Sequence, residues 1–413
     1  MCAFSMAASH ARGKGEVDAV FSVLKKANDA VARLGKDKVV NASIGAIFDD
    51  EEKFVSLSAV NEYYREMPAE ELMNYAAIAG LPDFLEAAVD FTFRGYKPEN
   101  TYIKAVATPG GTGAVRHVFY NYVEEGQKAL IPDWFWGPYR TIADEHLRGV
   151  DTYAMFDENY EFTLNSLKEK TQELLKVQDN LVIVFNTPAH NPTGYTMSMG
   201  DWQETFSFLK KCAEDKSKKI VLLLDIAYID YAGTVEETRG FMKLFSTLPE
   251  NILVTIAFSM SKSFLMYGMR SGALIGVSTS QDVAQEFFDI NAYSNRGVWS
   301  NGTRGAQKLL ADVAKNPELQ AKIDAEREQY TKLIKDRAAI FMKEAKEVGL
   351  KTLPFRAGFF ITVPASDPKK VAEKLAQDNI FVVPLKKGVR FAICSVPTHK
   401  MSGLAAKTKQ AME

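Results

Sequence analysis

A lysine and an arginine stand eight residues apart in the segment AFSMSKSFLMYGMRSG, residues 257–272. The lysine, Lys262, follows an apolar run that predicts a buried strand, and a buried amine is unfavourable unless it is used or paired. Burial also lowers the pKa of a lysine, as an amine nucleophile or a Schiff-base partner requires. Ser259, Ser261 and Arg270 are suited to bind a phosphate dianion together. Taken alone, the segment fits a surface loop with an incidental lysine about as well.

Three further segments place polar residues after apolar runs. In AHNPTG, Asn191 opens a turn, which by itself is ordinary turn chemistry. Asp225 ends the apolar run at residues 220–224 and Tyr228 follows it, so the carboxylate either faces a ligand or caps the next element. The segment TPGGTGA, residues 108–114, joins glycines to the start of a predicted helix, which favours an anion site and lacks the spacing of a dinucleotide site.

These segments belong to an alternation of amphipathic stretches with short, nearly continuous apolar runs. Strands buried on both faces have this character, so the pattern predicts an α/β fold with helices on both sides of a mostly parallel sheet. Ligands of such sheets bind beyond the carboxyl ends of the strands. The predicted strands are residues 102–108, 128–132, 181–185, 220–224, 252–258 and 272–277, and the predicted helices between them include residues 81–93 and 201–215.

The pattern changes after about residue 300. Two helices are predicted at residues 305–313 and 317–348, and the second is long and rich in Lys, Glu and Ala. Strand candidates follow at residues 358–363, 380–384 and 389–394. We therefore expect a large domain at residues 51–305 and a smaller α+β domain formed by residues 1–50 and 306–413, with the long helix connecting them.

In combination and order, the motifs resemble those of fold-type I pyridoxal-phosphate enzymes, specifically class I/II aminotransferases of the aspartate and aromatic type. The strongest matches are SxSK followed by Gly-x-Arg, AHNPTG and DxAY, and the likeness extends from Val40 to about Ala392. The resemblance implies a large domain around a mostly parallel seven-stranded sheet flanked by helices, and a smaller α+β domain. It also implies pyridoxal 5'-phosphate as the cofactor and ping-pong transamination between an L-amino acid and a 2-oxo acid.

The resemblance gives roles to the residues that match the family motifs. Lys262 would hold the cofactor as a Schiff base and carry a proton between the substrate α-carbon and the cofactor. Asp225 would pair with the pyridine nitrogen and keep it protonated, while Asn191 and Tyr228 would hydrogen-bond the ring hydroxyl oxygen. The residues that would surround the phosphate are Gly111, Thr112, Ser259, Ser261 and Arg270.

Aromatic residues complete the implied cofactor site. In PDWFWGPY, Trp136 would stack on the cofactor ring because Tyr139 follows it at the family spacing, and Trp134 is the less favoured choice. Tyr75, in NYAAIAGL, matches a tyrosine that reaches the phosphate of the neighbouring subunit's cofactor. This match implies a homodimer with shared active sites; the alternative for Tyr75 is an aromatic residue packed in the core.

For the substrate, Arg390 in GVRFAI matches the arginine that binds the α-carboxylate, and Gly45 matches a glycine close to the same carboxylate. Dicarboxylate-specific members carry a second arginine, three residues before the aromatic of an aromatic-Ser-Asn sequence; here that position is Ile290. An isoleucine cannot pair with a carboxylate, which puts strict aspartate specificity in doubt. We expect aromatic or other neutral donors and 2-oxoglutarate as acceptor. Arg296 is a nearby substitute, although an exposed loop arginine is the expected state.

Two other positions depart from the family pattern. Tyr139 stands where a histidine is often found next to the stacking aromatic, and Gly110 stands where the family has a serine before the Gly-Thr pair. The glycine removes one phosphate contact. Neither change threatens cofactor binding, and both bear on which amino acid enters.

Composition and charge exclude several classes of function. Fifty basic against 52 acidic residues give a net charge of -2 over 413 residues, which offers no electrostatic footprint for nucleic acid or an anionic membrane. No apolar run approaches the ~20 residues of a membrane span, and the start of the chain predicts an arm rather than a signal peptide. Cys2, Cys212 and Cys394 form neither a metal-ligand spacing nor a disulfide framework, so we expect a cytoplasmic protein without a metal.

Two rival functions follow from the same residues. A lyase or decarboxylase of this fold would use the same cofactor contacts, because those contacts do not report the reaction type. A binding or regulatory protein with a degenerate site is the rival from another class. Retention of Lys262, Asp225, Asn191, Arg270 and Arg390 argues against it.

Overall fold

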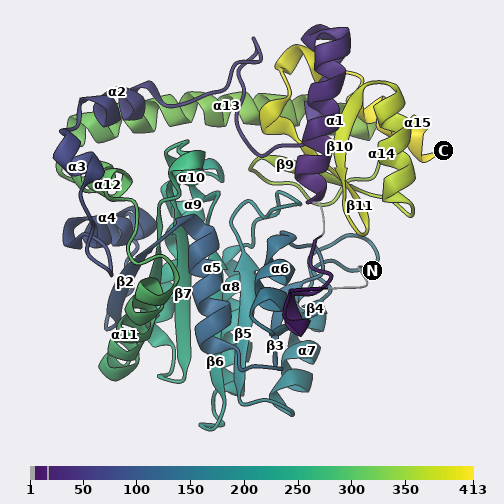
Figure 1. Ribbon diagram of the computed structural model, residues 1–413. Coiled ribbons are helices and arrows are strands. Elements are labelled where there is room, and N and C mark those ends of the chain that lie inside the picture. The colour runs from purple at the N-terminus through teal and green to yellow at the C-terminus, as the bar shows by residue number, and fades with distance from the viewer. Residues whose placement is uncertain (1–4, 16–17) are drawn as a thin grey trace.

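A seven-stranded sheet forms the centre of the computed structural model, which describes residues 5–15 and 18–413 (Figure 1). The strand order is β2-β8-β7-β6-β5-β3-β4, and β8 runs antiparallel to both of its neighbours while the other neighbouring pairs are parallel. The predicted α/β fold with a mostly parallel sheet is therefore confirmed. The strands are β2 (Tyr102–Thr108), β3 (Lys128–Pro132), β4 (Gly149–Tyr153), β5 (Asn180–Asn186), β6 (Lys219–Asp225), β7 (Ile252–Ser259) and β8 (Gly272–Ser278).

The central strands match the predicted apolar runs because both of their faces are covered. Every residue of β7 and β8 is buried, as expected for strands in the middle of a sheet that lies between two layers of helices. The edge strand β4 was not predicted. Its sequence, GVDTY, is only partly buried and carries polar residues, so it lacks the apolar run that identifies the others.

Helices cover both faces of this sheet. On one face, side chains from α5 (Gly110–Tyr122), α6 (Pro138–Glu145) and α11 (Gln281–Val298) pack with the strands in one apolar cluster. On the other face, α4 (Pro82–Phe93), α7 (Asn165–Leu175) and α8 (Met199–Cys212) contribute to the main core. The other helices around the large sheet are α2 (Ser58–Glu66), α3 (Ala69–Met73), α9 (Val235–Arg239), α10 (Met260–Ser263) and α12 (Arg304–Lys315).

A second, four-stranded sheet has the order β1-β10-β11-β9. Its strands are β1 (Val40–Ala42), β9 (Phe360–Pro364), β10 (Ile380–Pro384) and β11 (Gly388–Ala392), and the nearby helices are α1 (Ala19–Leu34), α14 (Pro368–Gln377) and α15 (Leu404–Met412). β1 pairs in parallel with β10, so a strand from near the start of the chain joins strands from its end. This is the smaller α+β part; its proposed limits, residues 1–50 and 306–413, stay a prediction.

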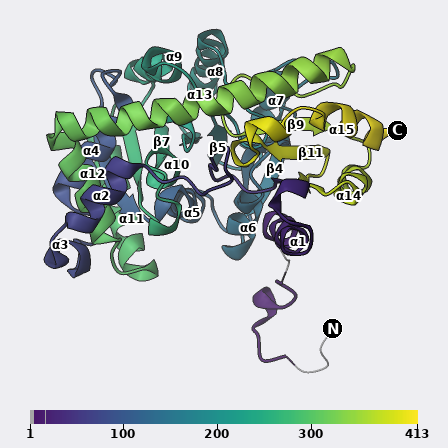
Figure 2. The same cartoon turned by 90° about the horizontal axis from the view of Figure 1, so that it is seen from above.

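The long helix α13 (Pro317–Glu347) runs across the molecule, above the large sheet and behind the smaller one in the view of Figure 1; Figure 2 shows it from above. Its predicted bounds agree to within one residue at the C-terminal end. None of the helices described in residues 5–15 and 18–413 is long and apolar enough to cross a membrane.

The structure corrects two predicted strands of the smaller sheet. The strand predicted at residues 358–363 begins two residues later, as β9. The strand predicted at residues 389–394 ends at Ala392, and Cys394 lies in a 3-10 turn. The chain leaves the sheet there because the Cys394 carbonyl accepts hydrogen bonds from the Phe48 amide and the Arg337 guanidinium instead of a strand. Cys2 lies outside the described residues; in the described part of the arm, Lys14 contacts the Asp144 carbonyl of α6 at 3.0 Å.

Candidate active site

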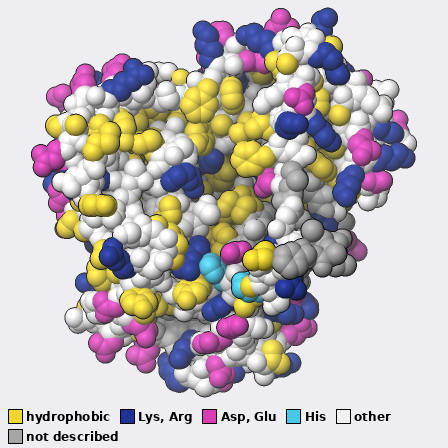
Figure 3. Space-filling view, in the orientation of Figure 1, with side chains coloured by type: hydrophobic (Ala, Val, Ile, Leu, Met, Phe, Trp, Pro, Cys, Tyr) yellow, Lys and Arg dark blue, Asp and Glu magenta, His cyan; other side chains and the backbone are white. Residues whose placement is uncertain are grey.

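Four of the predicted site residues come from the carboxyl ends of three neighbouring strands and from the smaller sheet. Asn191 follows β5, Asp225 ends β6, and Lys262 lies on α10 directly after β7. Arg390 enters from β11 of the smaller sheet. The face drawn in Figure 3 is hollowed between the two sheet-bearing parts, and apolar and basic side chains gather there.

Lys262 is half-buried and its amine points across to the smaller part of the molecule. The Nζ atom donates to the Gly45 carbonyl at 2.9 Å and lies 4.5 Å from the centre of the Tyr267 ring. Burial lowers the pKa of Lys262 to about 8. The amine is thus much closer to neutral at physiological pH than a surface lysine. Tyr267, which carries no motif of its own, was not predicted.

Asp225 is buried and held by two hydrogen bonds. The Tyr139 hydroxyl donates to Oδ2 at 2.5 Å and the Ala227 amide donates to Oδ1 at 3.2 Å. Burial raises the pKa of Asp225, and these hydrogen bonds oppose the increase. Burial and the nearby Asp225 carboxylate raise the pKa of Tyr139, so its hydroxyl stays protonated and donates. The residue that departs from the family histidine therefore supports the key carboxylate.

Replacing Tyr139 with phenylalanine is expected to weaken cofactor binding and to lower kcat by about 10-fold or more. A hydrogen bond to a charged group contributes about 1.5–3 kcal/mol, and its loss leaves Asp225 with a higher pKa. The cofactor dissociation constant and kcat measure this. Tyr153→Phe, which changes another buried tyrosine, is the control. Equal values for Tyr139→Phe and the wild type would show that the hydroxyl does not support Asp225.

Asn191 links two other predicted residues. Its Nδ2 donates to the Tyr228 hydroxyl at 3.4 Å, and its Oδ1 accepts from Arg390 Nη1 at 3.2 Å. Arg390 also donates to the Ser43 carbonyl at 2.8 Å, and its guanidinium carbon lies 4.3 Å from the centre of the Phe360 ring. Its buried Nε has no hydrogen-bond partner among the described residues. The cation therefore has capacity to bind an anion.

Phe360 was not predicted, although it helps to shape the site. A Cβ atom on Gly45 would lie 2.7 Å from the Phe360 ring, so a larger residue there would displace the ring. The Phe360 ring also packs edge-on against Tyr228, with 5.6 Å between centroids. Phe360 stands in an apolar strand, where an aromatic residue gives no signal beyond packing.

The predicted phosphate residues meet around Arg270. Its Nη1 donates to the Ser261 hydroxyl at 3.2 Å, and the Ser259 hydroxyl accepts from the Ser261 amide at 3.2 Å. Across from these serines, a Cβ atom on Gly111 would lie 3.5 Å from the Ser259 Cβ. Thr112 lies beside Gly111 in the first turn of α5, with its side chain exposed. A helix start, two hydroxyls and a guanidinium together suit a dianion.

The glycine that departs from the family serine has a structural reason. Gly110 has a φ of +69°, which non-glycine residues rarely adopt, and a Cβ atom there would lie 3.0 Å from Arg270 Nη2. A serine would strain the backbone and crowd the guanidinium. Arg270 Nη2 lies directly beside this glycine and donates to the Pro109 carbonyl at 3.4 Å, just before the start of α5.

The two tryptophans lie in different environments. Trp136 is half-buried and packs edge-on against Tyr139, with 5.4 Å between ring centroids. It therefore lies beside the tyrosine whose hydroxyl donates to Asp225. Trp134 is 6% exposed and belongs to the main hydrophobic core. This placement favours Trp136 as the residue that faces the cofactor.

Tyr75 and Arg296 are exposed in the single chain, and Ile290 is half-buried. Tyr75 is 81% exposed, which is the opposite of the core packing considered as its alternative. Ile290 lies half-buried on α11, near Tyr293, which is 84% exposed. Arg296 is exposed as expected, but it lies on α11 rather than in a loop because that helix continues to Val298; it donates to the Ser300 hydroxyl at 2.7 Å.

The comparisons with known proteins agree with this geometry. The sequence profile of the family described as "Aminotransferase class I and II" matches residues 37–407. The chain belongs to this family. An aminotransferase of known structure from Anaerococcus prevotii DSM 20548 is 37% identical, with a TM-score of 0.97 over 99% of this chain and 100% of that chain.

More distant aminotransferases share the fold. The aspartate aminotransferase of Salmonella typhi is 25% identical over 317 residues, 75% of this chain and 77% of the relative. The structure of an aromatic-amino-acid aminotransferase from Burkholderia pseudomallei, covalently bound to pyridoxal phosphate, has a TM-score of 0.80 at 20% identity and covers 98% of this chain and 100% of that chain. The predicted class of enzyme, an aminotransferase, and its fold are confirmed. The roles of individual residues in this aminotransferase stay predictions.

Proposed function

We propose that this aminotransferase uses pyridoxal 5'-phosphate, held by Lys262, to move the amino group of a neutral or aromatic L-amino acid to a 2-oxo acid. 2-Oxoglutarate is the proposed acceptor. The observation that carries the proposal is the position of the Lys262 amine, half-buried and with a pKa lowered to about 8, between the part of the chain that carries Asp225 and Arg270 and the part that carries Arg390.

The residues present fit this cofactor. Ser259, Ser261 and Arg270 lie with the start of α5 where a dianion is favoured. The buried Asp225 carboxylate has a raised pKa, which a cationic ring nitrogen beside it would lower again. When bound, pyridoxal phosphate supplies an aldehyde that bonds to an amine and a ring that accepts electrons from the substrate α-carbon.

The chain's own residues would then perform the remaining tasks. Lys262, with a pKa near 8, can take a proton from the substrate α-carbon and return it, because a far larger fraction of its amine is neutral at physiological pH than for an ordinary lysine. Arg390 would bind the substrate α-carboxylate with the hydrogen-bonding capacity that it does not use within the chain. The Asn191 amide would fix the positions of Arg390 and Tyr228 through its hydrogen bonds to both side chains.

The proposed donor class and assembly rest on Ile290 and Tyr75. Ile290 supplies no charge for a side-chain carboxylate, which favours neutral and aromatic donors. The Tyr75 side chain, 81% exposed, is free to enter a neighbouring subunit, and we therefore propose a homodimer with shared sites. The cytoplasmic location stays a prediction from the sparse cysteines.

Half-reactions test the proposed function. The holoenzyme is mixed with one amino acid at a time, without an oxo acid, and the cofactor absorbance and the released oxo acid are measured. We expect conversion to the amine form of the cofactor with about one oxo acid per site, fastest for aromatic or other neutral donors. Lys262→Ala, which lacks the amine, is the matched control and should not turn over.

Other outcomes separate the rival functions. Consumption of the amino acid without formation of the amine form would indicate a lyase or decarboxylase. A donor ranking in which aspartate exceeds every neutral amino acid by orders of magnitude would contradict the role given to Ile290. A protein that binds no cofactor in a Lys262-dependent way would contradict the proposal as a whole.

A further inference from the structure

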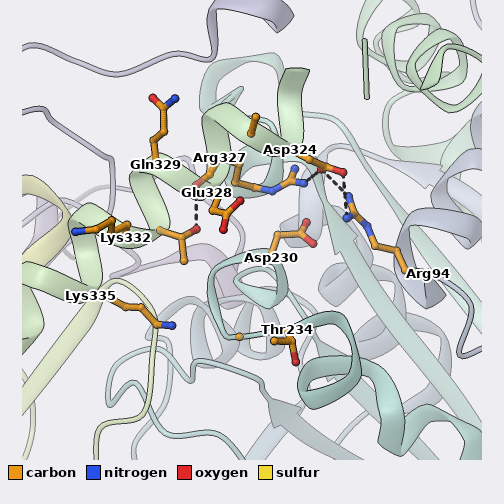
Figure 4. Close-up of a pocket in the computed structure, with 12 residues that line it drawn as sticks. Arg94, Asp230, Thr234, Asp324, Arg327, Glu328, Gln329, Lys332 and Lys335 are labelled. Carbon is orange, nitrogen blue, oxygen red and sulfur yellow. Dashed lines mark hydrogen bonds and ion pairs between the residues drawn. The ribbon is translucent and has the colours of Figure 1, made fainter. Parts of the chain in front are cut away.

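A cluster of charged side chains lies next to the short helix α10, which carries Lys262. Arg327, on the long helix α13, is 4% exposed, and Asp230, in the turn after β6, has a side chain that is 8% exposed (Figure 4). Arg239 Nη2 donates to Asp230 Oδ1 at 2.6 Å. Arg327 also pairs with Asp324, which accepts from Arg94 as well. The cluster lies at the wall of a cavity of about 690 Å³.

The cluster contacts the residue directly after Lys262. Arg327 Nη1 donates to the Ser263 carbonyl at 2.9 Å, and both groups are buried. Burial alone would raise the pKa of Asp230. The charges of Arg327 and Arg239 and the nearby Ser263 hydroxyl lower this pKa by more than burial raises it, so the carboxylate stays charged. Ser263 is therefore held through its carbonyl by Arg327 of α13, and its hydroxyl lies by the charged Asp230 carboxylate.

The cluster is in turn fixed to the rest of the large sheet. Arg239 Nε donates to the Thr92 carbonyl at 3.0 Å and Nη2 to the Phe91 carbonyl at 3.4 Å, both at the end of α4. The Phe91 ring packs edge-on against the Phe264 ring, 5.6 Å away between centroids. The support of α10 thus reaches helices α4 and α13, which are far from it in sequence.

Helix α10 needs such support because it is short. It has four residues, and Leu265, just after it, has a φ of 51°, in the left-handed region. Four residues form a single turn, which is unstable without tertiary contacts. A catalytic amine must stay within a fraction of an ångström of its reacting partner, and a displacement of about 1 Å lowers rates by about 100-fold.

We propose that Arg327 is a positioning residue, which together with Asp230 fixes the main chain of the turn that carries Lys262. The inference rests on the proposed role of Lys262 as the cofactor-bearing amine. Arg327 is proposed to contact neither substrate nor cofactor. It acts through the Ser263 carbonyl, so that the Lys262 side chain moves while its main chain stays in place.

Variants on either side of this contact test the proposal in the holoenzyme. Arg327→Met removes the donor, Arg327→Lys keeps one cationic donor, and Ser263→Ala removes only the hydroxyl that lies by Asp230 and keeps the carbonyl that Arg327 contacts. Arg94→Met is the matched control, since it removes a cation of the same cluster that shares Asp324 but has no hydrogen bond to α10. The melting temperature, the cofactor dissociation constant, kcat and KM are measured for each.

For Arg327→Met we expect kcat to fall about 10- to 100-fold, with KM for the amino donor within about 3-fold of the wild type. The cofactor dissociation constant should rise at least about 10-fold. Arg327→Lys should recover part of both losses, and Ser263→Ala should show smaller changes in the same direction. Arg94→Met should keep wild-type kcat and cofactor affinity.

Failure of this inference differs from failure of the proposed function. If Arg327→Met folds and keeps wild-type kcat and cofactor affinity, Arg327 does not position Lys262; where Arg327→Met does not fold, wild-type kcat and cofactor affinity in Arg327→Lys lead to the same conclusion. Equal losses in Arg94→Met would show that the cluster acts only on stability, which also overturns the inference. A wild-type protein whose cofactor binding does not depend on Lys262 would instead contradict the proposed function itself.

Discussion

Lys262→Ala is expected to reduce transamination by about 10⁴-fold or more while leaving the fold intact. The variant loses both the amine that would hold the cofactor and the proton carrier of the reaction. Single-turnover rates with one amino acid, together with circular dichroism, measure the effect. An added small primary amine should restore part of the proton transfer. A variant that retains more than a few per cent of the wild-type rate would show that another group moves the proton.

The same amine should lower the stability of the cofactor-free protein at neutral pH. Its pKa in the fold is about 8, below the usual 10.5, so the unfolded chain binds the proton more tightly. This difference corresponds to about 3 kcal/mol that disfavours folding below pH 8 and is relieved as the pH rises towards 10.5. Cofactor-free Lys262→Met should therefore be more stable than the wild type at pH 7, by up to about 3 kcal/mol.

Urea unfolding at pH 7 and near pH 10.5 checks both the size and the sign of this effect. The advantage of Lys262→Met should shrink at the higher pH. Lys332→Met, which changes an exposed lysine whose side chain is 75% accessible, is the matched control and should show no such trend. A Lys262→Met variant without any gain at pH 7 would show that water reaches the amine freely.

Arg390→Leu is expected to lower kcat/KM for every amino donor and every 2-oxo acid by roughly 30-fold to several thousand-fold. Loss of one partner of a buried charged contact costs about 2–5 kcal/mol, and every substrate of this class carries the same α-carboxylate. The Phe360 ring and the Asn191 amide hold the guanidinium in one place, so the fork is preorganised for a planar anion.

Arg390→Lys is the matched variant for this prediction. It keeps the positive charge and loses the fork, so its kcat/KM should lie between those of the wild type and Arg390→Leu. Cofactor affinity should remain near the wild-type value in both variants, because the predicted contacts of the cofactor lie on the large sheet. A loss confined to one donor would mean that Arg390 contacts a side chain rather than the shared carboxylate.

The parts of the molecule that sequence could predict are those with a local signal. β2 and β3 agree with the predicted apolar runs to the residue, and α13 agrees to within one, because burial on both faces and sustained helical periodicity leave a local pattern. The polar edge strand β4 leaves no such pattern.

The missed site residues act through contacts distant in sequence. The hydrogen bond from Tyr139 to Asp225 joins residues 86 positions apart, and that from Arg327 to Ser263 joins residues 64 apart. Tyr139 was recognised as a departure from the family but not as a support for Asp225. Phe360 looks like any other aromatic residue of a strand until its neighbours are known.

The pairing of β1 with β10 sets an order of assembly during synthesis. Val40 leaves the ribosome early, but its partner Ile380 follows 340 residues later. At about 5–20 residues per second, that delay lasts roughly 20–70 s, whereas the large sheet has all of its strands once Ser278 has emerged. The nascent chain therefore carries an unpaired β1 next to a large sheet that already has all of its strands, and the substrate arginine on β11 is among the last parts of the site to arrive.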